Sequence, residues 1–258
     1  MKSQKDNSEN QIVISNLKKT FSHNNEMLEV LNIPKLIINK NEFVAIVGQS
    51  GCGKTTLLNI LSGFTSFQGG VSIFGKEKIT PSSNKAVVFQ EDAVFPWMTV
   101  FENIGYSLKI QQISKKIREK RISQLISLVE LKGAENKYPK QLSGGMKKRV
   151  DIARAVANSP DIILMDEPFG SLDYQTRKQL QQKLLHLLDS EPKTILFVTH
   201  DVNEALLLSD RIIVLPKKSH GNLKDIKITL QKNRSLDICD TPEFIQLRNN
   251  IESIITSN

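Results

Sequence analysis

The sequence predicts an α/β protein in which helices cover a mainly parallel β-sheet. Short apolar runs of strand length recur along the chain, and segments with helical periodicity fill most of the intervals between them. Such alternation is typical of βαβ units, whose crossover helices pack on a parallel sheet. A glycine-rich turn between one of these strands and the following helix adds an anion-binding loop to this fold.

Buried strands are predicted where an apolar run is too short for a helix. These runs are residues 43–47, 86–89, 162–165, 195–198 and 212–215. Two further runs near the N-terminus, at 12–14 and 36–38, predict antiparallel strands beside the main sheet. We expect them to form an antiparallel β subdomain.

A helical subdomain is predicted over about residues 96–160, where no strand pattern is found. Apolar residues recur there with the spacing of one helix face, at Ile122, Leu125, Ile126 and Val129 and again at Met146, Val150, Ala153 and Ala157. Ser143 stands at the N-cap position of the second of these helices. The tail, about residues 216–258, is predicted to contain a lysine-rich loop, a strand at 226–230 and a helix from about Pro242.

Length and composition set limits on these elements. With 258 residues, of which 39% are hydrophobic, the chain is long enough for one well-packed domain or at most two small ones, and we expect one domain over residues 1–258. No stretch reaches the roughly twenty apolar residues of a membrane helix. Residues 1–10 are polar and lack the apolar core of a secretory signal, so we expect the protein in the cytoplasm. In that compartment Cys52 and Cys239 are not expected to form a disulfide.

The formal net charge of +8 fits two interpretations: nucleic acid binding, or work beside an anionic membrane surface and anionic ligands. Lysines are spread along the chain, and the densest basic run, residues 115–121, includes Glu119 within a helical pattern. A solvated helix face is therefore the preferred interpretation of this run. Charge alone does not choose between the partners.

Residues 48–55, Gly-Gln-Ser-Gly-Cys-Gly-Lys-Thr, match the phosphate-binding pattern GxxxxGK[ST] between a predicted strand and a predicted helix. Glycines let successive N–H groups turn toward an anion, and the helix dipole adds positive charge. Lys54 is expected to reach the β- and γ-phosphates of ATP, and the Thr55 hydroxyl is expected to hold Mg²⁺. The residues predicted to contact ATP here are Gly48, Gln49, Ser50, Gly51, Cys52, Gly53, Lys54, Thr55 and Thr56. A glycine-rich turn with a surface lysine is the alternative, which the strand–loop–helix setting disfavours.

Two acids follow the apolar run at 162–165, at the carboxyl end of a strand, where ligands bind in open α/β sheets. Asp166 resembles the aspartate that coordinates Mg²⁺ in P-loop ATPases. Glu167 is placed to take a proton from, or to orient, the water that attacks the γ-phosphate. An exposed pair of acids at a strand end is the structural alternative.

A second glycine-rich helix start lies at Leu142-Ser143-Gly144-Gly145-Met146, and no strand leads into it. This segment resembles the signature of the ABC ATPase family, which usually reads LSGGQ and here ends in Met146. The resemblance implies a P-loop NTPase core of the ABC type, in which the signature of one copy closes over the γ-phosphate bound by another. It therefore implies a homodimer with two ATP molecules between the subunits, contacted also by Ser143, Gly144 and Gly145.

Further residues match this family in chain order. Gln90 resembles the glutamine that contacts Mg²⁺ and the attacking water, and His200 resembles the histidine that senses the γ-phosphate. Residues 171–173 resemble the loop that crosses the dimer seam. Phe21 matches the aromatic residue that stacks on adenine, usually tyrosine, although taken alone it is better explained by a structural role. The resemblance, which covers about residues 12–215, implies as catalytic residues Glu167, His200, Gln90 and Lys54, and as Mg²⁺ ligands Thr55, Gln90 and Asp166.

The segment 95–104, which includes Trp97, and the string 166–173 resemble the nitrate, sulfonate and taurine importer subfamily. Related importers carry pyrimidine precursors of thiamine, so the solute stays open. The resemblance implies an ATPase subunit at the cytoplasmic face of the membrane, with permease subunits as partners and an extracytoplasmic solute-binding protein as an indirect partner. We expect Trp97 to contact the permease.

A soluble ABC ATPase that acts on nucleic acid or ribosomes is the alternative function. Such proteins split their halves with a long coiled coil or carry two ATPase domains, and one set of motifs in 258 residues does not match either arrangement. Nucleic acid is therefore not expected as a partner. The effect of Met146 in the signature and the role of the tail stay open.

Overall fold

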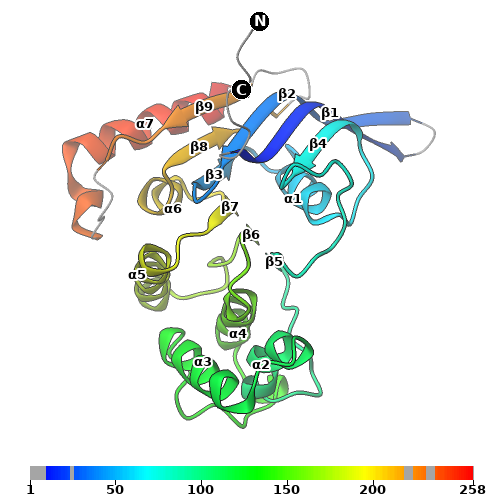
Figure 1. Ribbon diagram of the computed structural model, residues 1–258. Helices are drawn as coiled ribbons and strands as arrows, with labels where there is room; N and C mark the ends of the chain where they lie inside the picture. Colours follow the sequence, from blue (N-terminus) through cyan, green and yellow to red (C-terminus); the bar gives the residue numbers. More distant parts are fainter. Residues whose placement is uncertain (1–9, 24–25, 218–222, 231–235, 258) are drawn as a thin grey trace, which may run out of the picture. The chain divides into compact units, whose positions relative to one another are not determined.

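The computed structural model describes residues 10–23, 26–217, 223–230 and 236–257. Residues 1–9 of the polar segment predicted at 1–10, and much of the lysine-rich loop after Leu215, lie outside these residues. The chain forms two compact units: a terminal unit, Met1–Ser82 with Lys193–Asn258, and a middle unit, Ser83–Pro192. Each unit has its own strands and helices, shown in Figure 1.

One sheet of the terminal unit is antiparallel, as predicted. Its central strand β1 (Asn10–His23) pairs with β2 (Glu26–Asn39) and with β4 (Gln68–Ile73). Strand β4 was not predicted, because two glycines interrupt its apolar pattern. Gly69 has φ 96°, and a Cβ there would lie 2.0 Å from the Asn16 carbonyl oxygen, so the close approach of β4 to β1 requires a glycine.

The parallel strands of the terminal unit are buried along their whole length or nearly so. Strand β3 (Phe43–Val47) lies between β7 (Thr194–Val198) and β8 (Arg211–Val214), parallel to both. Helices α1 (Lys54–Ser62) and α6 (Val202–Leu208) lie on either side of these strands (Figure 1). Near-continuous apolar strands covered by helices are the pattern of a parallel α/β sheet, and the predicted fold class is confirmed.

The tail adds two elements to this unit. Strand β9 (Lys224–Lys227) pairs antiparallel with β8, and helix α7 (Pro242–Ser257) begins at the predicted proline. The strand begins and ends earlier than the predicted 226–230. The Arg211 Nε atom lies 2.7 Å from Asp225 Oδ1. This cross-strand ion pair stabilises the pairing of the polar residues before Ile226 with β8.

The middle unit combines two parallel strands with a group of helices. Strand β5 (Lys85–Val88) pairs in parallel with β6 (Ile162–Asp166). The helices are α2 (Val100–Ile110), α3 (Lys115–Leu128), α4 (Gly144–Ala157) and α5 (Tyr174–Ser190), with a short 3₁₀ turn at Pro139–Gln141. The apolar face predicted in α3 is fully buried, at Ile122, Leu125, Ile126 and Val129. Helices α2, α3 and α4 pack on one another through such faces (Figure 1).

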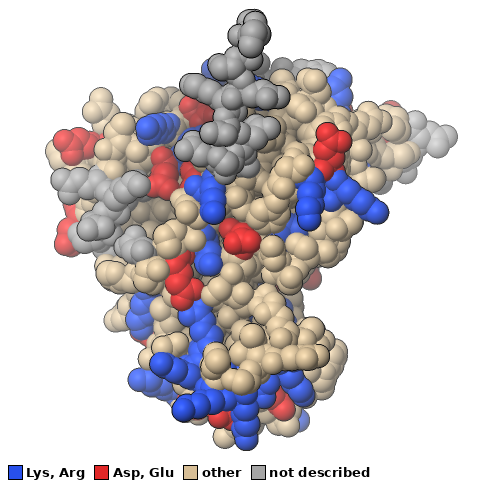
Figure 2. Space-filling model, in the orientation of Figure 1, with Lys and Arg blue, Asp and Glu red and all other residues tan. Residues whose placement is uncertain are grey.

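The basic run at 115–121 forms much of helix α3. Lys115, Lys116 and Lys120 are exposed there, and Lys115 forms an ion pair of 3.8 Å with Glu119 one turn along the helix. Figure 2 shows Lys and Arg side chains gathered over the helices of the middle unit, with acidic side chains among them. The solvated helix face predicted for this run is confirmed. Among the described residues, no helix is long and apolar enough to cross a membrane.

Candidate nucleotide-binding site

The phosphate cradle, residues 48–55, joins the carboxyl end of β3 to the start of α1. Gly48 and Gly53 have φ 153° and 95°, and both are crowded by their neighbours. A Cβ on Gly48 would lie 2.7 Å from the Leu215 carbonyl oxygen, and one on Gly53 would lie 2.6 Å from Leu31 Cδ2. Glycine is therefore required at both positions. The first amides of α1, which have no acceptor within the helix, open onto this loop.

Lys54 is buried at the first position of α1, and its ammonium group bends back over the loop. Its Nζ donates to the carbonyl oxygens of Gly48, at 2.8 Å, and Gln49, at 3.0 Å. A cation held beside inward-facing amides fits a polyphosphate. Cys52 lies beneath this ammonium, and burial raises the pKa of its thiol although Lys54 acts to lower it. Cys52 is therefore a small protonated packing residue.

His200 lies at the same edge of the terminal unit as the cradle. Strands β3 and β7 are parallel neighbours, and Thr199 at the end of β7 donates its N–H to the Ile46 carbonyl of β3. The next residue, His200, is exposed. Asp201 then caps α6 by accepting the N–H of Asn203 at 2.8 Å. The turn thus presents the imidazole to solvent beside the phosphate loop.

The adenine contact predicted for Phe21 falls on strand β1. Its ring is 43% exposed, so a face is open for stacking. The Lys19 ammonium lies 4.7 Å from the ring centroid. This cation adds positive charge close to the ring.

The two acids lie at the end of β6 in the middle unit. Asp166 is the last residue of the strand and is buried, while Glu167 is half-buried. Glu167 has φ 45°, a left-handed conformation that is rare for a residue with a side chain. Gln90 lies just past β5, the neighbouring strand, and its Nε2 donates to Glu167 Oε2 at 3.4 Å. Two residues predicted to act on the same water molecule therefore meet.

The second glycine-rich segment begins helix α4. Ser143 is its N-cap, with the hydroxyl accepting the Met146 N–H at 3.2 Å. Ser143 and Gly144 are exposed. Gly145 packs close to Leu172, whose Cδ2 would lie 3.2 Å from a Cβ on that glycine. The open N-terminus of a long helix is a second place where an anion fits.

The predicted residues divide between the two units. The terminal unit holds Phe21, the whole cradle and His200, and the middle unit holds Gln90, Ser143, Gly144, Gly145, Asp166 and Glu167. The predicted Mg²⁺ ligands are divided in the same way, with Thr55 in one unit and Gln90 and Asp166 in the other. All three offer oxygen atoms, the donor type that Mg²⁺ prefers.

One residue of the middle unit was missed by the sequence analysis. Lys148 of α4 is 1% exposed, and its ammonium donates to three successive carbonyl oxygens, those of Phe89, Gln90 and Glu91. Burial lowers the pKa of this ammonium, which the carboxylates of nearby aspartates partly offset. The sequence held a signal, because α4 has apolar residues on more than one face and Lys148 lies where burial is expected.

The comparisons with known proteins agree with this geometry. A strand, a glycine-rich loop, a buried lysine and a helix define the class of P-loop nucleotide-binding proteins. Residues 31–170 match the family model described as ABC transporter, and the chain belongs to that family. It is an ATPase of the ABC type.

Two relatives and one solved structure show how far the similarity extends. The chain is 39% identical to the bicarbonate transport ATP-binding protein CmpD of Synechocystis sp., covering 92% of this chain and 86% of that one. It is 40% identical to the aliphatic sulfonates import ATP-binding protein SsuB of Bacillus cereus, over 87% and 88% of the two chains. A dimeric ATP-binding cassette in a post-hydrolysis state, bound to ADP and Pi, is 33% identical, with a TM-score of 0.76 over 85% of this chain and 100% of the other.

Proposed function

We propose that this chain is the ATP-binding subunit of an ABC importer and that two copies hydrolyse ATP between them. The observation that carries the proposal is the presence of two anion sites in one chain. One is the phosphate cradle with Lys54, and the other is the exposed N-terminus of α4 at Ser143. A single triphosphate does not need both, so the second site is free to serve ATP bound by another copy.

The exposure of the α4 N-terminus supports pairing of two copies. Ser143 and Gly144 face solvent, so their amides are accessible to a triphosphate carried by a second molecule. The solved structure with similar fold is a dimer bound to the hydrolysis products. Since ATP would then join two cationic surfaces and its cleavage would remove that link, hydrolysis shifts the population from closed to open dimers.

Each chemical step of ATP binding and hydrolysis falls to a residue described above. Lys54 and the loop amides bind the β- and γ-phosphates, and the ring of Phe21 stacks on adenine. Thr55, Gln90 and Asp166 would hold Mg²⁺, which neutralises phosphate charge when bound. Glu167 accepts a proton from the attacking water or orients it, and the amide of Gln90 fixes that carboxylate. His200 contacts the γ-phosphate from the edge of β7.

The permease contact is proposed at Trp97, in the loop that follows Gln90. Its side chain is 69% exposed and stacks on Phe95, with the ring centroids 5.6 Å apart. An exposed, pre-positioned aromatic is a typical interface anchor. The chain would thus act at the cytoplasmic face of a membrane, below permease subunits that receive solute from an extracytoplasmic binding protein. The names of both relatives favour a small anion as the solute, such as bicarbonate or a sulfonate.

The test is the Glu167→Gln variant, with ATP and Mg²⁺ present. We expect it to bind ATP, to lose nearly all turnover and to accumulate as a dimer, because bound ATP is no longer cleaved. Light scattering after size-exclusion chromatography and a phosphate-release assay measure the two effects. Glu119→Gln, which changes an exposed carboxylate of the same unit, is the matched control and should behave as wild type. Normal hydrolysis by Glu167→Gln would refute the proposed role.

A further inference from the structure

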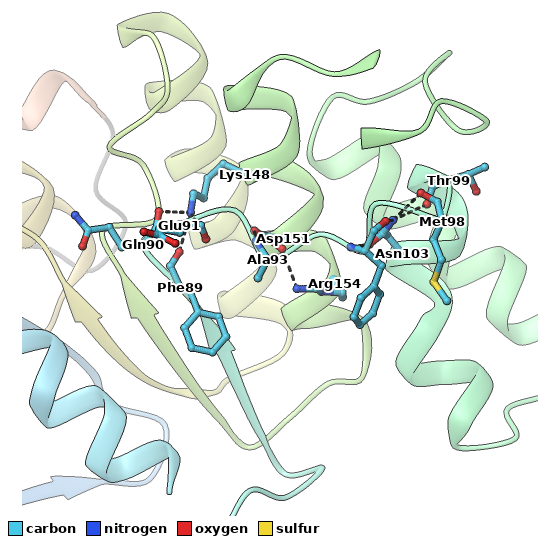
Figure 3. A network of polar contacts seen from close by, with 11 residues as sticks. Phe89, Gln90, Glu91, Ala93, Met98, Thr99, Asn103, Lys148, Asp151 and Arg154 are labelled. Atoms are coloured by element: carbon cyan, nitrogen blue, oxygen red, sulfur yellow. Dashed lines mark hydrogen bonds and ion pairs between the residues drawn. The ribbon is translucent and has the colours of Figure 1, made fainter. Parts of the chain in front are cut away.

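The buried ammonium of Lys148 organises the main chain around Gln90. Its Nζ lies 2.7 Å from the Phe89 oxygen, 2.7 Å from the Gln90 oxygen and 3.4 Å from the Glu91 oxygen. Figure 3 shows these carbonyl groups directed at the end of the Lys148 side chain. An ammonium group has three protons, and three consecutive peptide groups supply their acceptors.

Burying the Lys148 ammonium costs hydration free energy, and removing it would cost three hydrogen bonds. A buried charge is stable only where hydrogen bonds replace the water it has lost. Removing the ammonium would leave three carbonyl oxygens of one loop in a site built around a cation. The Lys148 side chain of α4 therefore binds the main chain of all three residues of the loop at 89–91.

Two further residues of α4 hold the continuation of the same loop. Asp151 accepts the Ala93 N–H at 2.9 Å, and the Arg154 guanidinium lies 4.8 Å from the centroid of the Phe95 ring. Lys148, Asp151 and Arg154 are spaced three residues apart on α4. Residues with this spacing lie on the same side of a helix. Figure 3 shows this side of α4 following the loop from Gln90 onward.

Gln90 is the residue of this loop that is proposed to act in ATP hydrolysis. The Gln90 side chain donates to Glu167, and its direction depends on the conformation of its own main chain. That main chain includes a carbonyl oxygen that accepts a hydrogen bond from Lys148 at 2.7 Å. Ser143 is the N-cap of α4, so the Lys148 backbone lies only about 7–8 Å along the helix axis from the proposed contact with a second copy.

We propose that Lys148 is a positioning residue for ATP hydrolysis: it fixes the main chain at 89–91 so that Gln90 meets Glu167, and it ties this pair to the helix that carries the signature. The inference rests on the proposed roles of Gln90 and Glu167. Lys148 acts through these residues and does not touch ATP. It therefore affects the rate of hydrolysis rather than nucleotide affinity, because the cradle belongs to the terminal unit.

Two variants separate the positioning role from a purely structural one. Lys148→Met keeps the length of the side chain and removes every donor, while Lys148→Gln keeps two donors and removes the charge. For Lys148→Met we expect kcat to fall by about tenfold or more, with KM for ATP and binding of a fluorescent ATP analogue within about twofold of wild type. Lys148→Gln should recover part of kcat.

The chain contains one tryptophan, Trp97, and it lies in the same loop. Its fluorescence is therefore a direct signal of how firmly the loop is held. Releasing the loop in Lys148→Met should increase the acrylamide quenching of Trp97. The melting temperature should fall because three carbonyl oxygens lose their donor, while ATP binding stays near that of wild type. Lys140→Met, which removes an exposed lysine of the middle unit, is the matched control and should change neither quenching nor kcat.

The outcomes are distinct. A lower kcat with unchanged ATP binding, greater quenching and partial recovery in Lys148→Gln supports the inference. Unchanged kcat in Lys148→Met overturns it, and so does a parallel loss of stability, binding and turnover in both variants, which is the mark of a structural role. Gln90→Ala and Glu167→Gln are measured in the same assay. Normal turnover in those two variants overturns the proposed site and the inference with it, whereas slow turnover in them beside normal Lys148→Met overturns the inference alone.

Discussion

Gln49 of the phosphate cradle donates a hydrogen bond from its Nε2 to the main-chain oxygen of Ile255, at 2.9 Å. These residues are 206 positions apart, so the last turns of α7 contact the loop proposed to bind the β- and γ-phosphates. The tail of the chain therefore contacts the loop that is proposed to bind phosphate.

Loss of this bond should weaken ATP binding. A net hydrogen bond contributes about 0.5–1.5 kcal/mol, so Gln49→Ala is expected to raise the Kd for ATP by about threefold to tenfold if the bond keeps the loop in its binding conformation. Isothermal titration calorimetry measures the change. Gln246→Ala, an exposed position on the same helix, is the control. Equal affinities for wild type and Gln49→Ala would show that α7 has no influence on the cradle.

The crowding at Gly48 leads to a second prediction. A Cβ there would meet both the Leu215 oxygen, at 2.7 Å, and Cys52 Sγ, at 2.8 Å, so the loop must shift to admit a methyl group. We expect Gly48→Ala to reduce ATP affinity by more than about tenfold, since the donors must keep their geometry. Gly75→Ala also places a side chain at positive φ but in open space, and it should cost about 1–2 kcal/mol of stability without affecting ATP binding. Denaturant unfolding and equilibrium binding test the pair, and a Gly48→Ala protein with wild-type affinity would contradict the prediction.

Glu102 predicts a pH dependence of stability. In the capping box of α2 it accepts hydrogen bonds from the Thr99 N–H and hydroxyl, and these bonds lower the pKa of its carboxyl below the ordinary value of 4.5. A lowered folded pKa means that its stabilising contribution is present above that value and is lost as pH falls through the folded pKa. The contribution is small because the group is exposed to solvent.

The comparison that isolates this contribution is wild type against Glu102→Gln, which keeps the capping geometry without the charge. Urea unfolding should show wild type as the more stable protein at pH 7. The difference should shrink as the pH falls below 4.5 and vanish once the pH is below the lowered folded pKa of Glu102. Glu119→Gln, an exposed carboxylate on α3, controls for the general loss of negative charge. A stability difference between wild type and Glu102→Gln that grows as the pH falls would contradict the prediction.

Burial of Cys52 predicts a slow reaction with alkylating agents. Its side chain is 2% exposed and the pKa of its thiol is raised above 9.0, so little thiolate is present at neutral pH. Cys239 is more exposed and should be labelled first by iodoacetamide. Peptide mass spectrometry over a range of pH follows both sites, and labelling of Cys52 is expected to become appreciable only at alkaline pH. Faster labelling of Cys52 at pH 7 would contradict the burial described here.

Local patterns predicted the elements that carry the chemistry. The cradle at 48–55 and the face of α3 at Ile122 and Leu125 depend on neighbours within a few residues, and the structure places both where the periodicity indicated. The N-cap role of Ser143 is equally local, since its partner is the Met146 N–H. Such features are visible in sequence because the atoms that stabilise them are close along the chain.

The features that were missed depend on residues distant in sequence. Strand β4 contains Gly69, whose presence is explained only by the nearby main chain of β1. Lys148 and its acceptor Phe89 are 59 positions apart in the sequence. Nothing near Lys148 in the sequence indicates which carbonyl groups it binds. The periodicity of α4 indicates that Lys148 is buried. Its hydrogen-bond acceptors are set by tertiary packing and are not visible in the sequence.

The exposed N-cap at Ser143 has a kinetic consequence. If each catalytic centre needs this helix end from a second molecule, the free protein at nanomolar dilution has two half-sites and no complete one. Specific activity should then climb with protein concentration and level off once association is complete. Anchoring two copies to one permease would abolish that dependence, because the tether supplies a high local concentration.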